Sequence, residues 1–225
     1  MREVVFDTET TGFDPFNGDR VVEIGCVIVE DYLPTTEVYH TYINPERDMP
    51  SSAEQVHGLS EEFLKGHPTF SEIIADFRDF CGDMKLVAHN AEFDMKFINW
   101  EMKNLGFTVF PASRAVDTLS IARRKFPGAS NTLDALCKRF SIDNSNRVKH
   151  GALLDAELLA EVYLELMGGR QTGFGLASEG SNIETAGPEA PIEKIRRTPR
   201  PHSASQEELD SHKAFIKTIE NSLWD

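Results

Sequence analysis

The sequence predicts an α/β protein in which one mixed β-sheet is flanked by helices, followed by a flexible tail with a C-terminal helix. Apolar, β-branched segments come first, segments with helical spacing then alternate with a short strand, and the composition changes after residue 169. The 225 residues suffice for one domain with a tail or for two small domains. We therefore expect one folded domain over 1–170, large enough to hold an active site, a flexible linker over 171–204 and an amphipathic helix over 205–225.

Strand-like segments combine apolar and β-branched residues over a short length. The segments 3–7 (EVVFD) and 21–29 (VVEIGCVIV) have this composition, and 38–43 is a third candidate. The shorter segment 85–89 (KLVAH) is expected to be a buried strand. These four strands would form the sheet.

Helices are indicated where apolar residues recur three and four positions apart. This spacing predicts helices over 70–81, 91–104, 132–140 and 151–167. Residues typical of helix ends flank three of them: Asn90 and Asn131 as N-caps, Gly106 after the second helix, and Gly168 and Gly169 after the last.

The tail has two parts. Residues 171–204 contain four glycines and four prolines with few apolar residues, which is typical of a linker. The next residues, SQEE from Ser205, form a capping-box pattern. An apolar stripe follows at Leu209, His212, Ile216, Ile219 and Leu223. This helix either folds back on its own domain or docks on a partner, with Phe215 and Trp224 as anchors.

The composition excludes several classes of protein. No run approaches the ~18 apolar residues of a membrane span, and the N-terminus has no apolar signal core. Three distant cysteines indicate neither a disulfide framework nor a zinc site, so we expect a reducing cytosol. A net charge of −14 and a pI near 4.9, taken alone, argue against a nucleic-acid-binding protein. Residues 120–150 nevertheless hold seven basic and two acidic side chains, which either contact phosphates or form a solvated face.

Asp7 and Glu9 lie in DTETTG, at the end of the first predicted strand. Strand residues two positions apart point to the same face, so the two carboxylates project together. Adjacent anions are unfavourable unless a cation compensates them or one stays protonated. Their oxygens suit Mg²⁺ or Mn²⁺; the alternative is a pair of ordinary strand-end acids.

Asp94 lies one turn into the predicted helix 91–104, within HNAEFD. Its apolar neighbours indicate that this helix face packs inward, where a carboxylate needs a partner. The alternative is an acid favoured by the helix dipole. Asp117 and Asp134 are expected to be helix-start or surface acids rather than ligands.

His150 and Asp155 lie in HGALLDA and cannot share one helix face, because five helical steps rotate by roughly 140° net. We expect His150 on the loop before the helix and Asp155 one turn inside it. Four carboxylates and one mobile histidine fit two-metal phosphoryl chemistry, in which the cations clamp the attacking and leaving oxygens and the histidine deprotonates water. Taken singly, a loop histidine is more often a surface residue.

Four motifs occur together in this chain: DTETTG from Asp7, VHGL from Val56, HNAEFD from His89 and HGALLDA from His150. In order and spacing they resemble the DEDDh 3′→5′ exonucleases. PTF from Pro68, TLDALC from Thr132 and LLAEVYL from Leu158 extend the likeness to the proofreading epsilon subunits of bacterial DNA polymerase III. The resemblance covers residues 1 to about 170.

The resemblance implies a ribonuclease-H-like fold and a bacterial, cytoplasmic exonuclease that releases nucleoside 5′-monophosphates from a mispaired DNA 3′ end. It implies that Asp7, Glu9, Asp94 and Asp155 hold two divalent cations, Mg²⁺ or Mn²⁺, and that His150 is the general base. It further implies a pocket for the terminal nucleotide, formed by Thr8, Thr10, Phe13, His57, Asn90 and Phe93. For Phe13, stacking on a base is the physical rationale.

The resemblance also extends to partners in the tail. Residues 171–176 (QTGFGL) are similar to a sliding-clamp-binding motif, although ordinary linker is the alternative. Residues 205–225 correspond to the segment that binds the polymerase alpha subunit. A ribonuclease of the same fold and a purely structural polymerase module are the rival functions. The acidic balance then predicts weak DNA binding by the isolated protein and dependence on a tether.

Overall fold

The computed structural model describes residues 1–147, 149–169 and 203–219. The chain divides into two units, the first containing the described residues up to 169 and the second containing 203–219. The predicted linker 171–204 lies outside the described residues except for its last two positions, and the clamp-like segment 171–176 lies wholly outside them.

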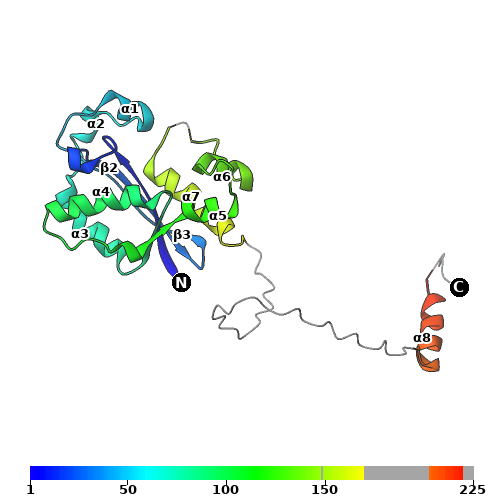
Figure 1. Cartoon of the computed structure of the whole chain (residues 1–225). Coiled ribbons are helices and arrows are strands. Elements are labelled where there is room, and N and C mark those ends of the chain that lie inside the picture. Colours follow the sequence, from blue (N-terminus) through cyan, green and yellow to red (C-terminus); the bar gives the residue numbers. More distant parts are fainter. Residues whose placement is uncertain (148, 170–202, 220–225) are drawn as a thin grey trace, which may run out of the picture. The chain divides into compact units, whose positions relative to one another are not determined.

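A sheet lies among the helices at the centre of the first unit (Figure 1). It has five strands in the order β3-β2-β1-β4-β5. β1 pairs antiparallel with β2 and parallel with β4, while β2–β3 is antiparallel and β4–β5 parallel. The strands are β1 (Arg2–Thr10), β2 (Val21–Glu30), β3 (Leu33–Tyr42), β4 (Lys85–Ala88) and β5 (Ala115–Asp117). The predicted mixed sheet is therefore confirmed.

The helices of this unit cover both faces of the sheet. They are α1 (Ser51–His57), α2 (Glu61–Leu64), α3 (Phe70–Cys81), α4 (Ala91–Asn104), α5 (Thr118–Lys125), α6 (Leu133–Phe140) and α7 (Ala152–Leu166). Two short 3₁₀ turns, η1 (Pro15–Asn17) and η2 (Ala112–Arg114), complete the elements. The bounds of α3 and α4 agree with the sequence prediction, because both have an unbroken apolar stripe.

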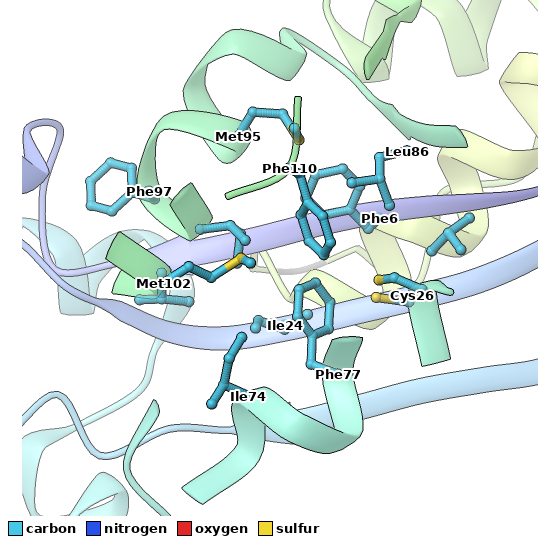
Figure 2. Close-up of a cluster of buried hydrophobic side chains, with 14 of the residues drawn as sticks. Phe6, Ile24, Cys26, Ile74, Phe77, Leu86, Met95, Phe97, Met102 and Phe110 are labelled. Atoms are coloured by element: carbon cyan, nitrogen blue, oxygen red, sulfur yellow. The ribbon is translucent and has the colours of Figure 1, made fainter. Parts of the chain in front are cut away.

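Strand alternation divides the core between the two faces. Phe6 and Ile24 face α3 and α4, and Figure 2 shows them between Phe77 of α3 and Met95 of α4. Val5, on the opposite face of β1, packs against α7 in a second cluster. A third cluster joins α7 to α5 and α6. Successive residues of β1 thus point alternately towards α4 and towards α7. The same alternation sets the direction of the acidic side chains at the carboxyl end of the strand.

The shortest and most exposed elements were not predicted. β5 has three residues, too few for a periodic signal, and most of β3 is exposed and polar, so only its second half resembled a strand. The short helices α1, α2 and α5 were also missed. Local patterns are weak where an element contributes little to the core.

Of the two predicted asparagine caps, Asn90 does occupy the N-cap position of α4, although without a side-chain hydrogen bond, whereas the Asn131 prediction was wrong. Asn90 precedes α4 in a left-handed conformation (φ 72°) and makes no side-chain cap; instead Asp117 Oδ1 accepts hydrogen bonds from the Asn90 and Ala91 amides. Thr132 caps α6 by accepting from the Ala135 amide at 3.2 Å. The Asn131 amide donates to two backbone carbonyls of the preceding turn.

α7 approaches the sheet most closely at Gly25 of β2. A Cβ atom at this glycine would lie 2.2 Å from the Leu153 amide nitrogen. Gly25 also pairs with Asp7 in the antiparallel register. The absence of a side chain therefore lets the first turn of α7 lie beside the end of β1.

The second unit contains α8 (Gln206–Ile216). The predicted capping box is confirmed: Ser205 Oγ accepts from the Glu208 amide, and the Glu208 carboxylate accepts from the Ser205 amide at 2.8 Å. None of the residues of α8 is buried, and Phe215 is 63% exposed. Leu223 and Trp224, expected as part of the stripe and as an anchor, lie outside the described residues. None of the described helices is long and apolar enough to cross a membrane.

Gly25→Ala is expected to destabilise the first unit by about 1–3 kcal/mol, because the new methyl group would overlap the backbone of α7. The free energy of unfolding in urea measures this effect. Gly66→Ala is the matched control, because a Cβ there would meet its nearest neighbour, Phe63 O, only at 3.9 Å. Equal stability of the two variants would contradict the close approach of α7.

Candidate active site

Asp7 and Glu9 lie near the carboxyl end of β1 and share the face on which Val5 packs against α7. Thr8, between them, points to the other side and donates a hydrogen bond of 2.7 Å from its Oγ1 to Asp94 Oδ1. The expected common projection of Asp7 and Glu9 is found in the structure. One strand therefore contributes to the site from both of its faces.

Asp94 lies in the first turn of α4 and is 3% exposed. Phe97 and Ile98, which follow it in α4, lie in the large core, so this helix face packs inward as expected. The N-terminus of α4 is held by Asp117, which caps α5 and also accepts from the first amides of α4. Asp117 thus places Asp94 although it is not itself part of the carboxylate cluster.

Asp155 lies in the first turn of α7, where Gly25 permits the helix to approach β1, and it is 3% exposed. His150 lies on the loop before α7, as expected, and its backbone amide donates to Val56 O at 3.3 Å. The Nδ1 atom of His150 is 3.3 Å from Asp155 Oδ2. Its side chain is 48% exposed, so the ring is accessible from solvent.

Burial and neighbouring negative charges raise the pKa of three of the carboxylates, Asp7, Glu9 and Asp94. Burial is the largest cause of the strongly raised pKa of Asp7, and the neighbouring charges of Asp94 and Glu9 add to it. Burial, followed by the charges of Asp155 and Glu23, raises the pKa of Glu9 to about 8. Burial also raises the pKa of Asp94, against the opposing effect of the Thr8 hydrogen bond. The cluster cannot carry four negative charges at neutral pH without a compensating cation.

Arg147 supplies positive charge to this cluster. Its Nε and Nη2 atoms donate to Asp155 Oδ1 and Oδ2 at 2.6 and 2.7 Å. Nη1 donates to Asp134 Oδ1 at 2.8 Å, and Nη2 lies 2.8 Å from His150 Nδ1. A guanidinium can only donate, so Nδ1 of His150 accepts here and is unprotonated.

From the sequence, Arg147 was expected only as one member of a basic segment that either contacts phosphates or forms a solvated face, and its contact with Asp155 was missed. Asp134, expected to be a surface helix acid, is an exposed acid of α6 and binds Arg147. The one sequence signal was general: buried acids need a counter-ion, and Arg147 is the basic residue that precedes the HGALLDA motif by three positions.

The residues of the cluster fit divalent cations. Glu9, His150 and Asp155 each offer a ligand atom within 4.8 Å of the others. The half-buried Asp7 and the buried Asp94 add carboxylates beside this group, since the charges of Asp94, Glu9 and Asp155 all raise the pKa of Asp7. A donor set dominated by carboxylate oxygens suits Mg²⁺ or Mn²⁺ better than a soft metal.

Two adjacent cavities meet at the carboxylates. The larger, about 830 Å³, extends from Asp7 and Asp155 past Arg123 to the loop before α6. The smaller, about 430 Å³, is bounded by β1, the turn after it and α1. Residues that line both cavities are Thr8, Glu9 and Phe93.

Five of the six expected nucleotide-pocket residues line the smaller cavity: Thr8, Thr10, Phe13, His57 and Phe93. Asn90 lines neither of these two cavities. Phe13 is 83% exposed and makes an edge-to-face contact with Phe93, with ring centroids 6.5 Å apart. The cavity therefore has an aromatic rim.

His57 carries an unpaired hydrogen-bonding atom in the wall of this cavity. Its Nδ1 accepts from the Leu59 amide at 3.0 Å, so the ring proton is on Nε2. Nε2 is buried and has no hydrogen-bond partner among the described residues. Burial lowers the pKa of His57, which keeps the ring neutral. A buried donor without a partner is costly, so its persistence points to a ligand.

The family model described as "Exonuclease" matches residues 4–163. The chain belongs to this exonuclease family. The match includes all four carboxylates and His150, and metal dependence is general to the family, in agreement with the donor set. The likeness to the DEDDh exonucleases derived from four motifs is confirmed.

Relatives of this exonuclease extend over nearly the whole chain. DNA polymerase III subunit epsilon of Rickettsia conorii is 47% identical over 222 residues, covering 97% of this chain and 96% of the relative. The subunit of Escherichia coli K12 is 41% identical over 237 residues, covering 99% and 97%. The closer likeness to epsilon subunits is therefore confirmed at the level of sequence.

Solved structures confirm the ribonuclease-H-like exonuclease fold. The nuclease domain of 3′hExo, a DEDDh family member bound to rAMP, has a TM-score of 0.64 at 16% identity and covers 74% of this chain and 91% of its own. Exonuclease X in complex with 5′-overhanging duplex DNA has a TM-score of 0.57 at 24% identity, covering 73% and 90%.

Glu9→Gln is expected to stabilise the ion-free exonuclease at pH 8 by on the order of 2 kcal/mol. The folded pKa of Glu9, about 8, lies above its ordinary value of 4.5. Between pH 4.5 and 8 the unfolded chain ionises Glu9 while the folded protein keeps it protonated, so the free energy of unfolding falls progressively as the pH rises through this range. Urea unfolding in EDTA at pH 5 and pH 8 measures this difference. Glu157→Gln, an exposed change on α7, is the control; an unchanged pH dependence in Glu9→Gln would contradict the charge assignment.

Proposed function

We propose that this protein is the proofreading 3′→5′ exonuclease subunit of a bacterial replicative DNA polymerase. It hydrolyses the terminal phosphodiester of a mispaired primer and releases a nucleoside 5′-monophosphate. The observation that carries the proposal is the convergence of four carboxylates from β1, α4 and α7 beside a loop histidine and two cavities. Relatives named DNA polymerase III subunit epsilon, at 40–48% identity, support DNA as the substrate and a polymerase as the partner.

Asp7, Glu9, Asp94 and Asp155 would hold the cations, which are Mg²⁺ or Mn²⁺. When bound, two divalent cations stabilise the attacking and leaving oxygens of an in-line phosphoryl displacement. The protein supplies the oxygen ligands. Without the cations, burial and neighbouring negative charges disfavour the ionised form of these carboxylates, as the raised pKa values of Asp7 and Glu9 show. Thr8 fixes the orientation of Asp94 through its 2.7 Å hydrogen bond.

His150 would accept the proton of the attacking water. Its position on the loop before α7 and its 48% exposure give water access to the ring, and Asp155 lies 3.3 Å from Nδ1. The lone pair of Nδ1 accepts from the Arg147 guanidinium at 2.8 Å, so Nδ1 can take the proton only after this contact is released.

The smaller cavity would bind the terminal nucleotide. The Nε2–H group of His57 donates to a sugar hydroxyl or phosphate oxygen, which satisfies the unpaired donor. Phe13 and Phe93 contact the base from the rim. Thr8 and Thr10 contribute polar atoms of β1, and Asn90 remains a proposed contact at the start of α4.

The tail would attach the exonuclease to its polymerase in the bacterial cytoplasm. Residues 205–225 are proposed to bind the polymerase alpha subunit, and the exposed Leu209, Phe215 and Ile219 of the described part support a docking role. Residues 171–176 are proposed to contact the sliding clamp. Attachment offsets the weak DNA affinity expected from a net charge of −14, because a tether raises the local concentration of the site.

Asp7→Asn is expected to lower the excision rate by at least about 10²–10³-fold. It removes one of the anionic ligands of the cations that would stabilise the charge of the transition state. The assay is Mg²⁺-dependent degradation of a 5′-labelled DNA primer with a 3′ mismatch. Asp79→Asn, an exposed change on α3, is the control.

The same assay separates the rival functions. An RNA oligonucleotide of the same sequence tests for a ribonuclease: faster degradation of RNA than of DNA would replace the proposed substrate. An unmodified protein without nuclease activity, but with polymerase binding intact, would leave only a structural role.

His57→Asn is expected to reduce kcat/KM on single-stranded DNA roughly tenfold, because the amide oxygen can replace Nδ1 as an acceptor while the Nε2–H donor is lost. Steady-state kinetics and the free energy of unfolding should be measured together. Gln55→Asn, an exposed change on the same helix, is the control. Unchanged kinetics in His57→Asn would rule out a contact between His57 and the nucleotide.

A further inference from the structure

Arg147 occupies the ligand atoms that the proposed metal site needs. It binds both carboxylate oxygens of Asp155, at 2.6 and 2.7 Å, and its Nη2 lies against His150 Nδ1. Asp155 and His150 are two of the three residues whose ligand atoms lie together within 4.8 Å. The guanidinium is therefore a permanently charged cation inside the site, and only 9% of the Arg147 side chain is exposed.

A divalent ion and the Arg147 guanidinium compete for the Asp155 carboxylate. Both are cations, and both would lie within bonding distance of the same carboxylate, where like charges repel strongly at low dielectric. Arg147 also blocks Nδ1 of His150. An ion that binds Asp155 must therefore weaken or break its two hydrogen bonds with Arg147.

The surroundings of Arg147 give it an alternative partner. It lies outside any helix or strand, between the end of α6 and the start of α7. Its Nη1 is bound to Asp134, an exposed carboxylate that also accepts from Asn144 Nδ2 at 3.0 Å. The contact with Asp134 can persist while the contact with Asp155 is lost.

We propose that Arg147 is a positioning residue that acts as an internal counter-ion: it holds Asp155 and His150 in the ion-free protein and gives way when a divalent ion binds. This inference rests on the proposed metal site. Arg147 compensates the buried carboxylates before the ion arrives, and its displacement lowers the affinity of the site for the ion. A purely structural ion pair would instead stabilise the ion-free and ion-bound proteins equally.

The test uses the full chain, MnCl₂ as the probe and no DNA. Isothermal titration gives the Kd for Mn²⁺, and thermal unfolding is recorded in EDTA and in saturating Mn²⁺. For Arg147→Gln we expect Mn²⁺ to bind on the order of tenfold more tightly, because a charge-assisted pair no longer has to be broken. The Tm in EDTA should fall, and the rise in Tm on adding Mn²⁺ should exceed that of the unmodified protein.

Two variants make the result specific. Arg123→Gln removes a positive charge from the same cavity, where no hydrogen bond or ion pair joins Arg123 to Asp155, and should leave the Kd within about twofold. Arg147→Lys retains the charge but not the bidentate geometry, and should give an intermediate Kd. It also serves as the test variant should Arg147→Gln fail to fold.

The outcomes are distinguishable. If the unmodified protein binds no Mn²⁺, the proposed metal site itself is wrong. If it binds Mn²⁺ but both Arg147 variants bind the ion equally well or more weakly, the counter-ion role is overturned. An equal loss of Tm with and without Mn²⁺ would identify Arg147 as a structural ion pair.

Discussion

The structure depends on holding four carboxylates together where water is scarce. Separately, each of Asp7, Glu9, Asp94 and Asp155 would lose hydration, and together they also repel one another. The raised pKa values of Asp7, Glu9 and Asp94 express these effects. Such a cluster cannot contribute to folding in the absence of a cation. The surrounding fold must therefore provide the stabilisation, and the large apolar clusters on both faces of the sheet do so. The apolar core supplies the folding free energy that keeps the site in place. A bound cation would compensate the negative charge of the carboxylates, which the apolar core cannot do.

The geometry of the cluster follows from strand alternation and close packing. Because alternate residues of β1 face α7 and α4, the strand directs Asp7 and Glu9 to one helix while Thr8 holds Asp94 on the other. α7 reaches the same point because Gly25 has no side chain. Backbone contacts thus fix the carboxylates, whereas His150 and Arg147 come from the loop between α6 and α7. The site combines rigid ligands with groups that are free to exchange partners.

Much of the fold and the grouping of the four acids could be predicted from the sequence, because strand alternation and helical spacing are local signals and the motifs keep a fixed order. The contacts that complete the site are not local. Asp117 binds the amide of Asn90, 27 positions away, so the expected Asn90 cap could not be judged from neighbouring residues. The unpaired Nε2 of His57 depends on what surrounds the ring. Arg147 lies eight residues before Asp155, but its burial against that acid is a tertiary property.

The acidity of this exonuclease follows from the same constraint. A net charge of −14 opposes association with DNA, yet it includes four clustered carboxylates whose charge bound cations would neutralise. The field near the scissile bond would then be set by the ions rather than by the surface as a whole. Repulsion elsewhere shortens the time that a free molecule spends on DNA. For an enzyme that should act only when a primer end is presented to it, weak binding favours selectivity, and the proposed attachment to a polymerase would supply the missing local concentration.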